Sequence, residues 1–400
     1  MSGFENRRRD GRQRRPARLT ALAATAVALP LLALGWTTAA GAQSSAPVPV
    51  HSPALPAATA ARLQQVLDQT QAQDGFPGVI AGVWSPKGHW IGTAGTQGPG
   101  QSGAPTAGDL TRIGSLTKTM TATVLLQLAQ RKKLSLDDPI SKYVPGLPNG
   151  KATLRQLADM TSGIPIYSTS DAFQHELFGD PGRAWTPQQL LTFVRNQKPD
   201  FAPGKGWEYD NSNYVLLGVV IEKVTKEPIA TVFRQRLFGP LGMTHTRFPT
   251  TTAFGGPHLS GVTDQGQSSG QVTNSTSWSP SSAFTAGEVV SNFNDLEKWA
   301  NALFTGKGIL KPATEQLRRN SIIHNIPPNT ATVGYGIGIG DRDGWWGHDG
   351  DIPGYTTVIF HNYSLNTTVI VEVNSDATTP GPSGQEPAPA VFAALAQALG

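Results

Sequence analysis

The sequence predicts an α+β protein whose two ends build one antiparallel sheet. Strand-like apolar segments occur early, at 78–84 and 89–93, and return only late, at 335–339, 356–360 and 368–373. The residues between these two groups carry apolar side chains at the three- and four-residue spacing of helices. We therefore expect the helical middle to be an insertion that forms a second lobe, with the first and last helices covering the sheet.

Local signals place the individual elements. Pro86, Lys87 and Gly88 predict the turn of a hairpin between the first two strands. Thr59 is expected to cap the first helix, and Thr186 to cap a later one. Apart from the segment that begins near Ser115, the helices expected from apolar spacing span residues 59–72, 154–160, 186–196, 214–224, 229–237 and 389–399.

The first 42 residues are typical of a secretory signal peptide. Seven arginines and two acidic residues precede an apolar run over 19–36, which is followed by small residues ending at Ala42. This predicts a secreted, extracellular protein, with cell-wall association as an alternative and with the Sec or Tat route left open. An uncleaved membrane anchor is the competing interpretation. The expected division is a signal peptide at 1–42, a flexible linker at 43–57 and a folded domain at 58–400, with an α/β lobe from 58–111 and 286–400 and a helical lobe at 112–285.

Composition excludes several classes of function. The formal net charge of +4 becomes −1 when residues 1–42 are removed, so the folded part gives no support to nucleic-acid binding. The chain has no cysteine, and its 8 histidines follow no metal-binding spacing, which predicts no metal and no cofactor. No later segment is apolar for long enough to span a bilayer, so we expect no stable membrane association after signal removal.

Ser115 and Lys118 open an apolar segment that continues through Leu128. Read as one helix, this segment places Ser115 in the first turn and Lys118 on the same face three residues later. Unpaired backbone N–H groups and the helix dipole favour negative charge at that end. A serine attacks a carbonyl poorly unless a neighbouring base takes its proton, and a lysine can do so once its pKa is lowered. The pair is therefore a candidate nucleophile and base for acyl transfer.

Two further motifs follow in order, Tyr209-Asp210-Asn211 and His348-Asp349-Gly350. Together with the serine and lysine, the ordered set Ser-x-x-Lys, Tyr-x-Asn and His-x-Gly resembles that of the serine penicillin-recognising hydrolases, which include class C β-lactamases and D-alanyl-D-alanine carboxypeptidases. Flanking segments, among them 157–163 and 335–338, support the resemblance over nearly the whole chain after the leader. It implies a β-lactamase-like three-layer α/β/α sandwich with an antiparallel sheet and an inserted, mostly helical lobe.

The resemblance gives each motif residue a role. It makes Ser115 the nucleophile and Lys118 the acceptor of its proton. Tyr209 would relay that proton to the leaving atom, a role that needs a lowered phenol pKa. His348 would help to hold positive potential over the site, and Asn211 would hydrogen-bond the substrate amide.

The resemblance also implies how the substrate is bound. Backbone N–H groups of Ser115 and Asp351 would stabilise the oxyanion, and Trp278 matches a position where related enzymes place an aromatic wall. In related carboxypeptidases a hydroxyl on the residue after the histidine helps to bind the free carboxylate of the substrate, but this chain has Asp349 there. An aspartate repels a substrate carboxylate unless Arg342 or another cation compensates.

The sequence thus predicts a secreted serine acyl hydrolase, with a D-Ala-D-Ala carboxypeptidase as the first expectation and a β-lactamase close behind. An esterase or amidase for neutral or cationic substrates is the alternative that Asp349 and Asp351 would tolerate better. A non-catalytic module that binds penicillin or cell-wall peptide is a third hypothesis, and the presence of Ser115, Lys118 and Tyr209 disfavours it. The expected partner is a small peptide, β-lactam or ester, and the oligomeric state stays open.

Overall fold

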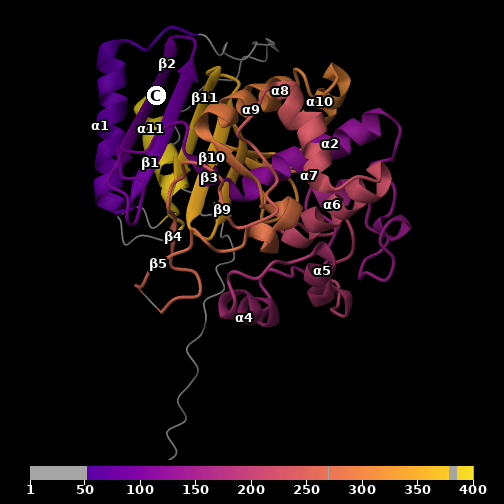
Figure 1. Cartoon of the computed structure of the whole chain (residues 1–400). Helices are drawn as coiled ribbons and strands as arrows, with labels where there is room; N and C mark the ends of the chain where they lie inside the picture. Colours follow the sequence, from indigo (N-terminus) through magenta and orange to yellow (C-terminus); the bar gives the residue numbers. More distant parts are fainter. Residues whose placement is uncertain (1–51, 269, 378–384, 400) are drawn as a thin grey trace, which may run out of the picture. The chain divides into compact units, whose positions relative to one another are not determined.

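Seven strands form one antiparallel sheet in the computed structural model, in the order β2-β1-β11-β10-β9-β8-β7. Figure 1 labels five of them, β2, β1, β11, β10 and β9. The structure describes residues 52–268, 270–377 and 385–399. The strands of this sheet are β1 (Gly78–Ser85), β2 (Gly88–Gly95), β7 (Val333–Tyr335), β8 (Gly340–Arg342), β9 (Trp345–Ile352), β10 (Tyr355–Asn362) and β11 (Thr367–Val373).

Strands from the two ends of the chain lie next to each other in the sheet. β1 pairs with β11, where Val79 lies opposite Val373, and β1 also pairs with β2 through the predicted hairpin. β11 in turn pairs with β10, where Val371 lies opposite Val358. The prediction of one antiparallel sheet built from both ends is confirmed.

The late strands differ from the sequence prediction in two places. Residues 335–339 do not form one strand, because β7 ends at Tyr335 and the chain turns before β8, with Gly338 at a φ of +67°. The sequence also fails to predict β9, whose glycine, histidine and aspartate residues interrupt any apolar alternation. This strand carries the third motif, so its position decides where His348, Asp349 and Asp351 lie.

Helices cover both faces of the sheet. On one face, Val79, Ala81 and Val83 of β1 pack in a cluster with α1 (Ala57–Asp74) and α11 (Pro387–Leu399). The alternate residues Ile80 and Trp84 belong to the second cluster, on the opposite face. Most of the remaining helices lie on that face of the sheet (Figure 1). The expected three-layer sandwich is therefore confirmed. Thr59 is not a helix cap, because α1 starts at Ala57 after Pro56 and has no side-chain cap.

The second cluster is built around α2 (Thr117–Gln130), in which every residue from 117 to 128 is buried. α6 (Asn211–Thr225) packs against α2, and Thr186 caps α5 with a capping box, as predicted. The sequence does not predict α4, α9 or α10. The other helices are α3 (Leu154–Ala158), α4 (Asp171–Gly179), α5 (Pro187–Arg195), α7 (Ile229–Phe233) with a π-helical continuation over Arg234–Phe238, α8 (Gly239–Leu241), α9 (Phe293–Thr305) and α10 (Pro312–Arg319).

Two short strand pairs form separate two-stranded sheets. β3 (Leu110–Arg112) pairs with β6 (Val290–Asn292), and β4 (Val262–Thr263) pairs with β5 (Thr273–Asn274). The predicted signal peptide at 1–42 lies outside the described residues. Within the described ranges, no helix combines the length and the apolar character that crossing a bilayer requires.

Candidate active site

Ser115 lies in a short 3₁₀ turn, η1 (Gly114–Leu116), between β3 and α2. The prediction that it belongs to the first turn of the long helix is therefore wrong, although α2 follows directly. The turn needs a glycine at position 114, which has a φ of +51°, and a Cβ there would lie 2.7 Å from the backbone nitrogen of Asp351. The backbones of η1 and β9 are thus in direct contact, and Ser115 is half-buried beside them.

Lys118 is completely buried and makes three hydrogen bonds. Its Nζ lies 2.8 Å from Ser115 Oγ, 2.7 Å from Asn211 Oδ1 and 2.9 Å from the carbonyl oxygen of Ala286. Burial lowers the pKa of Lys118 to about 7, against the nearby charges of acidic residues, which raise it. At neutral pH a large fraction of the side chain is a free amine within hydrogen-bond distance of the serine hydroxyl.

Tyr209 precedes α6 and completes the group around Ser115. Lys118 Nζ lies 4.7 Å from the centre of its ring. Burial raises the pKa of Tyr209 well above its ordinary value, although the neighbouring Ser115 side chain lowers it. The prediction of a lowered phenol pKa is wrong for the free protein, in which Tyr209 is a neutral phenol that can donate a proton.

Asn211 is the first residue of α6, and Asp210 caps that helix by accepting a hydrogen bond of 2.6 Å from the backbone nitrogen of Ser212. The Asn211 oxygen accepts from Lys118, and its Nδ2 donates to Ser168 Oγ at 3.0 Å. The amide therefore holds the lysine in place in the free protein. Its predicted contact with a substrate amide stays a prediction.

His348 is buried in β9 with both ring nitrogens engaged. Nδ1 contacts the carbonyl oxygen of Asp349, which can only accept, so Nδ1 carries the proton, and Nε2 accepts from the Tyr335 hydroxyl at 2.8 Å. Burial lowers the pKa of His348 to about 4. The prediction that His348 supplies positive potential is therefore wrong near neutral pH, because the imidazole is uncharged.

The outer edge of β9 changes partner at the site. β8 pairs with β9 only as far as Gly347, and beyond that point η1 lies against the strand. A Cβ at Gly350 would lie 2.0 Å from the carbonyl oxygen of Ile113, so this approach requires glycine. The backbone of Asp351 therefore lies next to that of Gly114, and Ser115 is the following residue. An oxyanion pocket formed by the backbone N–H groups of Ser115 and Asp351 requires this arrangement.

The two aspartates of β9 differ in their surroundings. Asp349 forms an ion pair with Arg342, whose Nη2 lies 2.9 Å from Asp349 Oδ2. Burial raises the pKa of Asp349, but the Arg342 guanidinium lowers it, so that the pKa lies below its ordinary value. The Asp351 side chain is solvent-accessible, yet the surrounding protein and the carboxyls of Glu386 and Asp376 raise its pKa.

Trp278 is half-buried against Phe178 of α4, with 6.3 Å between the ring centres. Its carbonyl oxygen accepts a hydrogen bond of 2.5 Å from Arg112, which also binds the carbonyl oxygens of Ser275 and Thr276. The buried arginine of β3 thus fixes the segment that carries Trp278. The recorded contacts of the Trp278 ring are with α4, and its role as an aromatic wall stays a prediction.

The sequence profile of the family described as Beta-lactamase matches residues 63–394. The chain belongs to the β-lactamase family. Among curated relatives, the chain is 29% identical over 265 residues to PbpX of Bacillus subtilis (strain 168) and 28% identical over 274 residues to Protein flp of Staphylococcus aureus (strain COL). Each match covers 66% of this chain, 61% of the Bacillus protein and 52% of the Staphylococcus protein. The matched region thus spans little more than half the length of these two relatives.

Solved structures of this β-lactamase fold include amidases. A D-stereospecific amidohydrolase from Streptomyces sp. has a TM-score of 0.72 at 34% identity, with 79% of this chain and 94% of that chain covered. A D-amino acid amidase from Ochrobactrum anthropi SV3, in complex with L-phenylalanine amide, has a TM-score of 0.75 at 28% identity, with 86% and 99% covered. An octameric penicillin-binding protein homologue from Pyrococcus abyssi has a TM-score of 0.72 at 25% identity, with 85% and 77% covered.

Sequence reasoning misses two residues of this β-lactamase-family site. Tyr335 lies in a recognised flanking motif, but nothing in the motif indicates that its hydroxyl bonds to His348. Ser168 receives a hydrogen bond from Asn211 and has no sequence signal, because it lies in a serine- and threonine-rich loop 43 residues before its partner. Arg342 is anticipated as a compensating cation, and the structure shows its ion pair with Asp349.

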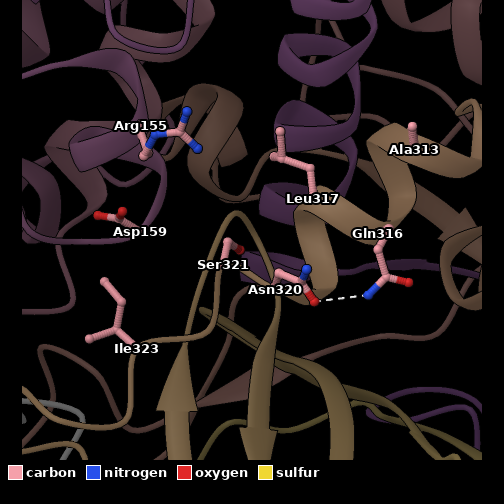
Figure 2. Close-up of a pocket in the computed structure, with 8 residues that line it drawn as sticks. All are labelled: Arg155, Asp159, Ala313, Gln316, Leu317, Asn320, Ser321 and Ile323. Carbon is pink, nitrogen blue, oxygen red and sulfur yellow. Dashed lines mark hydrogen bonds between the residues drawn. The ribbon is translucent and has the colours of Figure 1, made fainter. Parts of the chain in front are cut away.

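A separate surface cavity of about 650 Å³ lies between α3 and α10 (Figure 2). None of the three motifs of this β-lactamase-family chain lines it. Several of its polar side chains are already paired: Gln316 donates to Asn320 at 2.8 Å, Asp159 accepts from Thr161, and Arg155 bonds to Asp137. We therefore place the chemistry at Ser115 and assign no step to this cavity. Its lining residues are Arg155, Asp159, Ala313, Gln316, Leu317, Asn320, Ser321 and Ile323.

Proposed function

We propose that this chain is a serine amidohydrolase that cleaves amides or short peptides of D-amino acids with a free amino group, through an acyl-enzyme at Ser115. The observation that carries the chemistry is the contact of Lys118 Nζ with Ser115 Oγ at 2.8 Å, with the ring centre of Tyr209 4.7 Å from the same Nζ. A hydroxyl, an amine with a pKa near neutrality and a neutral phenol are the groups that acyl transfer to serine and protonation of an amine leaving group require.

In the proposed reaction the free amine of Lys118 takes the proton of Ser115 as Oγ forms a bond to the substrate carbonyl carbon. Backbone N–H groups of Ser115 and Asp351 stabilise the resulting oxyanion. As the carbon–nitrogen bond breaks, Tyr209 gives its proton to the leaving nitrogen and regains one from the Lys118 ammonium. Water then attacks the ester, its proton returns through the same groups, and the acid product leaves with Ser115 restored.

Two observations favour a substrate with an ammonium group over one with a free carboxylate. His348 is neutral, and the positive charge of Arg342 is matched by Asp349, so neither offers an unpaired cation for a carboxylate. The accessible side chain of Asp351 has acidic neighbours, and a bound ammonium would relieve the repulsion among them. Two structural relatives, a D-stereospecific amidohydrolase and a D-amino acid amidase, support the same substrate class.

A D-Ala-D-Ala carboxypeptidase is the second candidate. It is favoured by Arg342, which lies on the neighbouring strand and could bind a substrate carboxylate if Asp349 released it. The exported, extracellular location inferred from residues 1–42 fits either candidate and stays part of this proposal.

A substrate panel tests the proposed function. Purified protein without residues 1–42 is assayed on D-phenylalanine amide, a D-Ala-D-Ala peptide, nitrocefin and p-nitrophenyl acetate, and its adduct with a fluorophosphonate is located by mass spectrometry. We expect the adduct on Ser115 and the highest kcat/KM on the D-amino acid amide. Preference for the peptide with the free carboxylate would support the second candidate, and failure of Ser115→Ala to abolish both adduct and turnover would reject the mechanism.

Tyr209→Phe should separate proton transfer to the leaving group from nucleophilic attack. Because an amine leaving group must be protonated, we expect kcat on the amide to fall by about 100-fold, within the usual range for general acid catalysis. The p-nitrophenolate of p-nitrophenyl acetate leaves without a proton, so its hydrolysis should fall much less. Tyr143→Phe, which removes a phenol bonded to Asp138 far from the motifs in sequence, is the matched control. Equal losses on both substrates would contradict the relay.

Asp351→Asn tests the ammonium-binding role, because it removes the carboxylate and keeps the backbone N–H of the oxyanion pocket. We expect KM for the cationic amide to rise about tenfold, which corresponds to about 1.4 kcal/mol of lost binding. Kinetic constants for the uncharged ester should stay unchanged. Asp343→Asn makes the same charge change at an exposed turn of the sheet and should leave both substrates unaffected. An unchanged KM for the amide in Asp351→Asn would refute the role.

A further inference from the structure

Asp376 follows β11 and is 4% exposed. Its carboxylate receives hydrogen bonds from two other parts of the chain. Oδ1 accepts from the backbone nitrogen of Gly354 at 3.0 Å, and Oδ2 accepts from Thr263 Oγ1 at 2.9 Å and from Gln265 Nε2 at 2.6 Å. The carboxylate therefore ties the turn between β9 and β10 to the segment around β4.

That turn is also enclosed by close contacts with the segment that holds Gly261 and Ser275. A Cβ at Gly354 would lie 2.1 Å from Ser275 Oγ, and a Cβ at Gly261 would lie 2.5 Å from the carbonyl oxygen of Gly354. The segment holding Gly261 and Ser275 is in turn fixed by Arg112, whose guanidinium donates a hydrogen bond to the carbonyl oxygen of Ser275. A displaced Gly354 would therefore have to move against this segment as well as lose its bond to Asp376.

The position of the turn matters because Asp351 lies three residues before Gly354. Beyond Gly347 the strand β9 has lost its pairing with β8, so β10 holds this part on one side and η1 contacts it on the other. If the β9–β10 turn moved, the part of β9 beyond Gly347, which includes Asp351, would shift relative to Ser115. Shifts of about 1 Å at catalytic groups can cost about 100-fold in rate.

We propose that Asp376 is a positioning residue that holds the β9–β10 turn, and thereby keeps the backbone N–H of Asp351 at the oxyanion pocket beside Ser115. The inference rests on the proposed function of that pocket. All three groups that bond to Asp376 are donors, so the side chain must present acceptors at both oxygens. An asparagine has one acceptor oxygen, and its NH₂ group, which is itself a donor, would lie opposite at least one of these donors.

Asp376→Asn is the main test, measured at pH 8, above the pKa of about 7 to which burial raises Asp376. The probe is a boronic acid, which forms a tetrahedral adduct with the serine oxygen and places an oxygen where the oxyanion forms. On the uncharged p-nitrophenyl acetate, whose binding does not depend on the acidic neighbours of Asp351, we expect kcat to fall 10- to 100-fold and boronate affinity to fall by the same factor. KM for this ester should stay within about twofold, since the oxyanion forms only after Ser115 has attacked. Titration with a fluorophosphonate normalises the rates to competent protein, so partial unfolding alone would leave the boronate affinity unchanged.

Thr263→Val is the second variant, because it removes one donor to Oδ2 and keeps the bond from Gly354 to Oδ1. We expect parallel losses of about threefold in kcat and boronate affinity. A folded Asp376→Asn protein with unchanged kcat and boronate affinity would overturn the proposal, and if that variant does not fold, an unchanged Thr263→Val would do so. Failure of the unaltered protein to bind the boronate at Ser115 would instead reject the proposed function itself.

Discussion

Replacing Lys118 with methionine is expected to lower kcat/KM on amide substrates by about 10⁴-fold, the upper part of the range for loss of a general base. Methionine fills a similar volume but cannot accept the proton of Ser115, to which Lys118 Nζ now bonds at 2.8 Å. The hydrogen bonds to Asn211 and Ala286 are lost as well, so the pocket loses both its base and the group that orders it. Steady-state kinetics at pH 8, with active protein counted by fluorophosphonate titration, measure the effect.

The pH profile of the unaltered protein supplies an independent check on Lys118. Because only the free amine accepts a proton, kcat/KM should rise with pH through an apparent pKa of about 7. Burial also raises the pKa of Asp376 to about 7, so the assignment to Lys118 requires that the step persists in Asp376→Asn. His348 should contribute no step near this pH, since burial lowers its pKa to about 4. His348→Gln serves as the control. If this variant removed the step at pH 7, the assignment of that step to Lys118 would be wrong.

The same lowered pKa affects the stability of the fold. Between pH 7 and about 10 the unfolded chain still binds a proton at Lys118 that the folded protein has released, so the free energy of unfolding should increase with pH. In Lys118→Met this contribution disappears. Urea unfolding at pH 7.5 and 9.5 compares the two proteins, and an equal pH dependence in both would contradict a lysine with a lowered pKa.

The parts of the site that the sequence predicts are those that depend on residue identity and order. The serine, the lysine and the tyrosine come together because their motifs sit at the ends of α2 and α6, which pack against each other. The fold was predictable for a related reason. Apolar strands at both ends of a chain must share one sheet if neither group is large enough to bury itself.

The errors concern properties that burial creates. The phenol pKa of Tyr209 rises and the charge of His348 disappears because both side chains are enclosed by segments distant in sequence, and a motif carries no measure of that enclosure. β9 is missed because its polar residues do not alternate as in an ordinary strand. Its outer edge meets the η1 turn instead of another strand of the sheet, so the usual pattern does not apply.

Gly350→Ala should have the second largest effect, a loss of about 100- to 1000-fold in kcat, comparable to removal of one oxyanion donor. A Cβ at this position would lie 2.0 Å from the carbonyl oxygen of Ile113 and 3.1 Å from the backbone nitrogen of Leu116. Backbone atoms cannot rotate away as a flexible side chain can, so β9 and η1 must separate. This separation moves the N–H of Asp351 away from Ser115. The contact between Ser115 and Lys118 should persist, because the two residues belong to the same segment of chain.

This geometry gives Gly350→Ala a distinct signature. The apparent pKa near 7 in kcat/KM should persist, because Lys118 stays in place, whereas affinity for a boronic acid should fall in parallel with kcat. Gly179→Ala is the matched control, since a Cβ at the end of α4 would meet no atom within 4 Å, and it should retain full activity. If Gly350→Ala kept its kcat, β9 and η1 would not form the oxyanion pocket, and the donor to the oxyanion other than Ser115 would have to come from another segment.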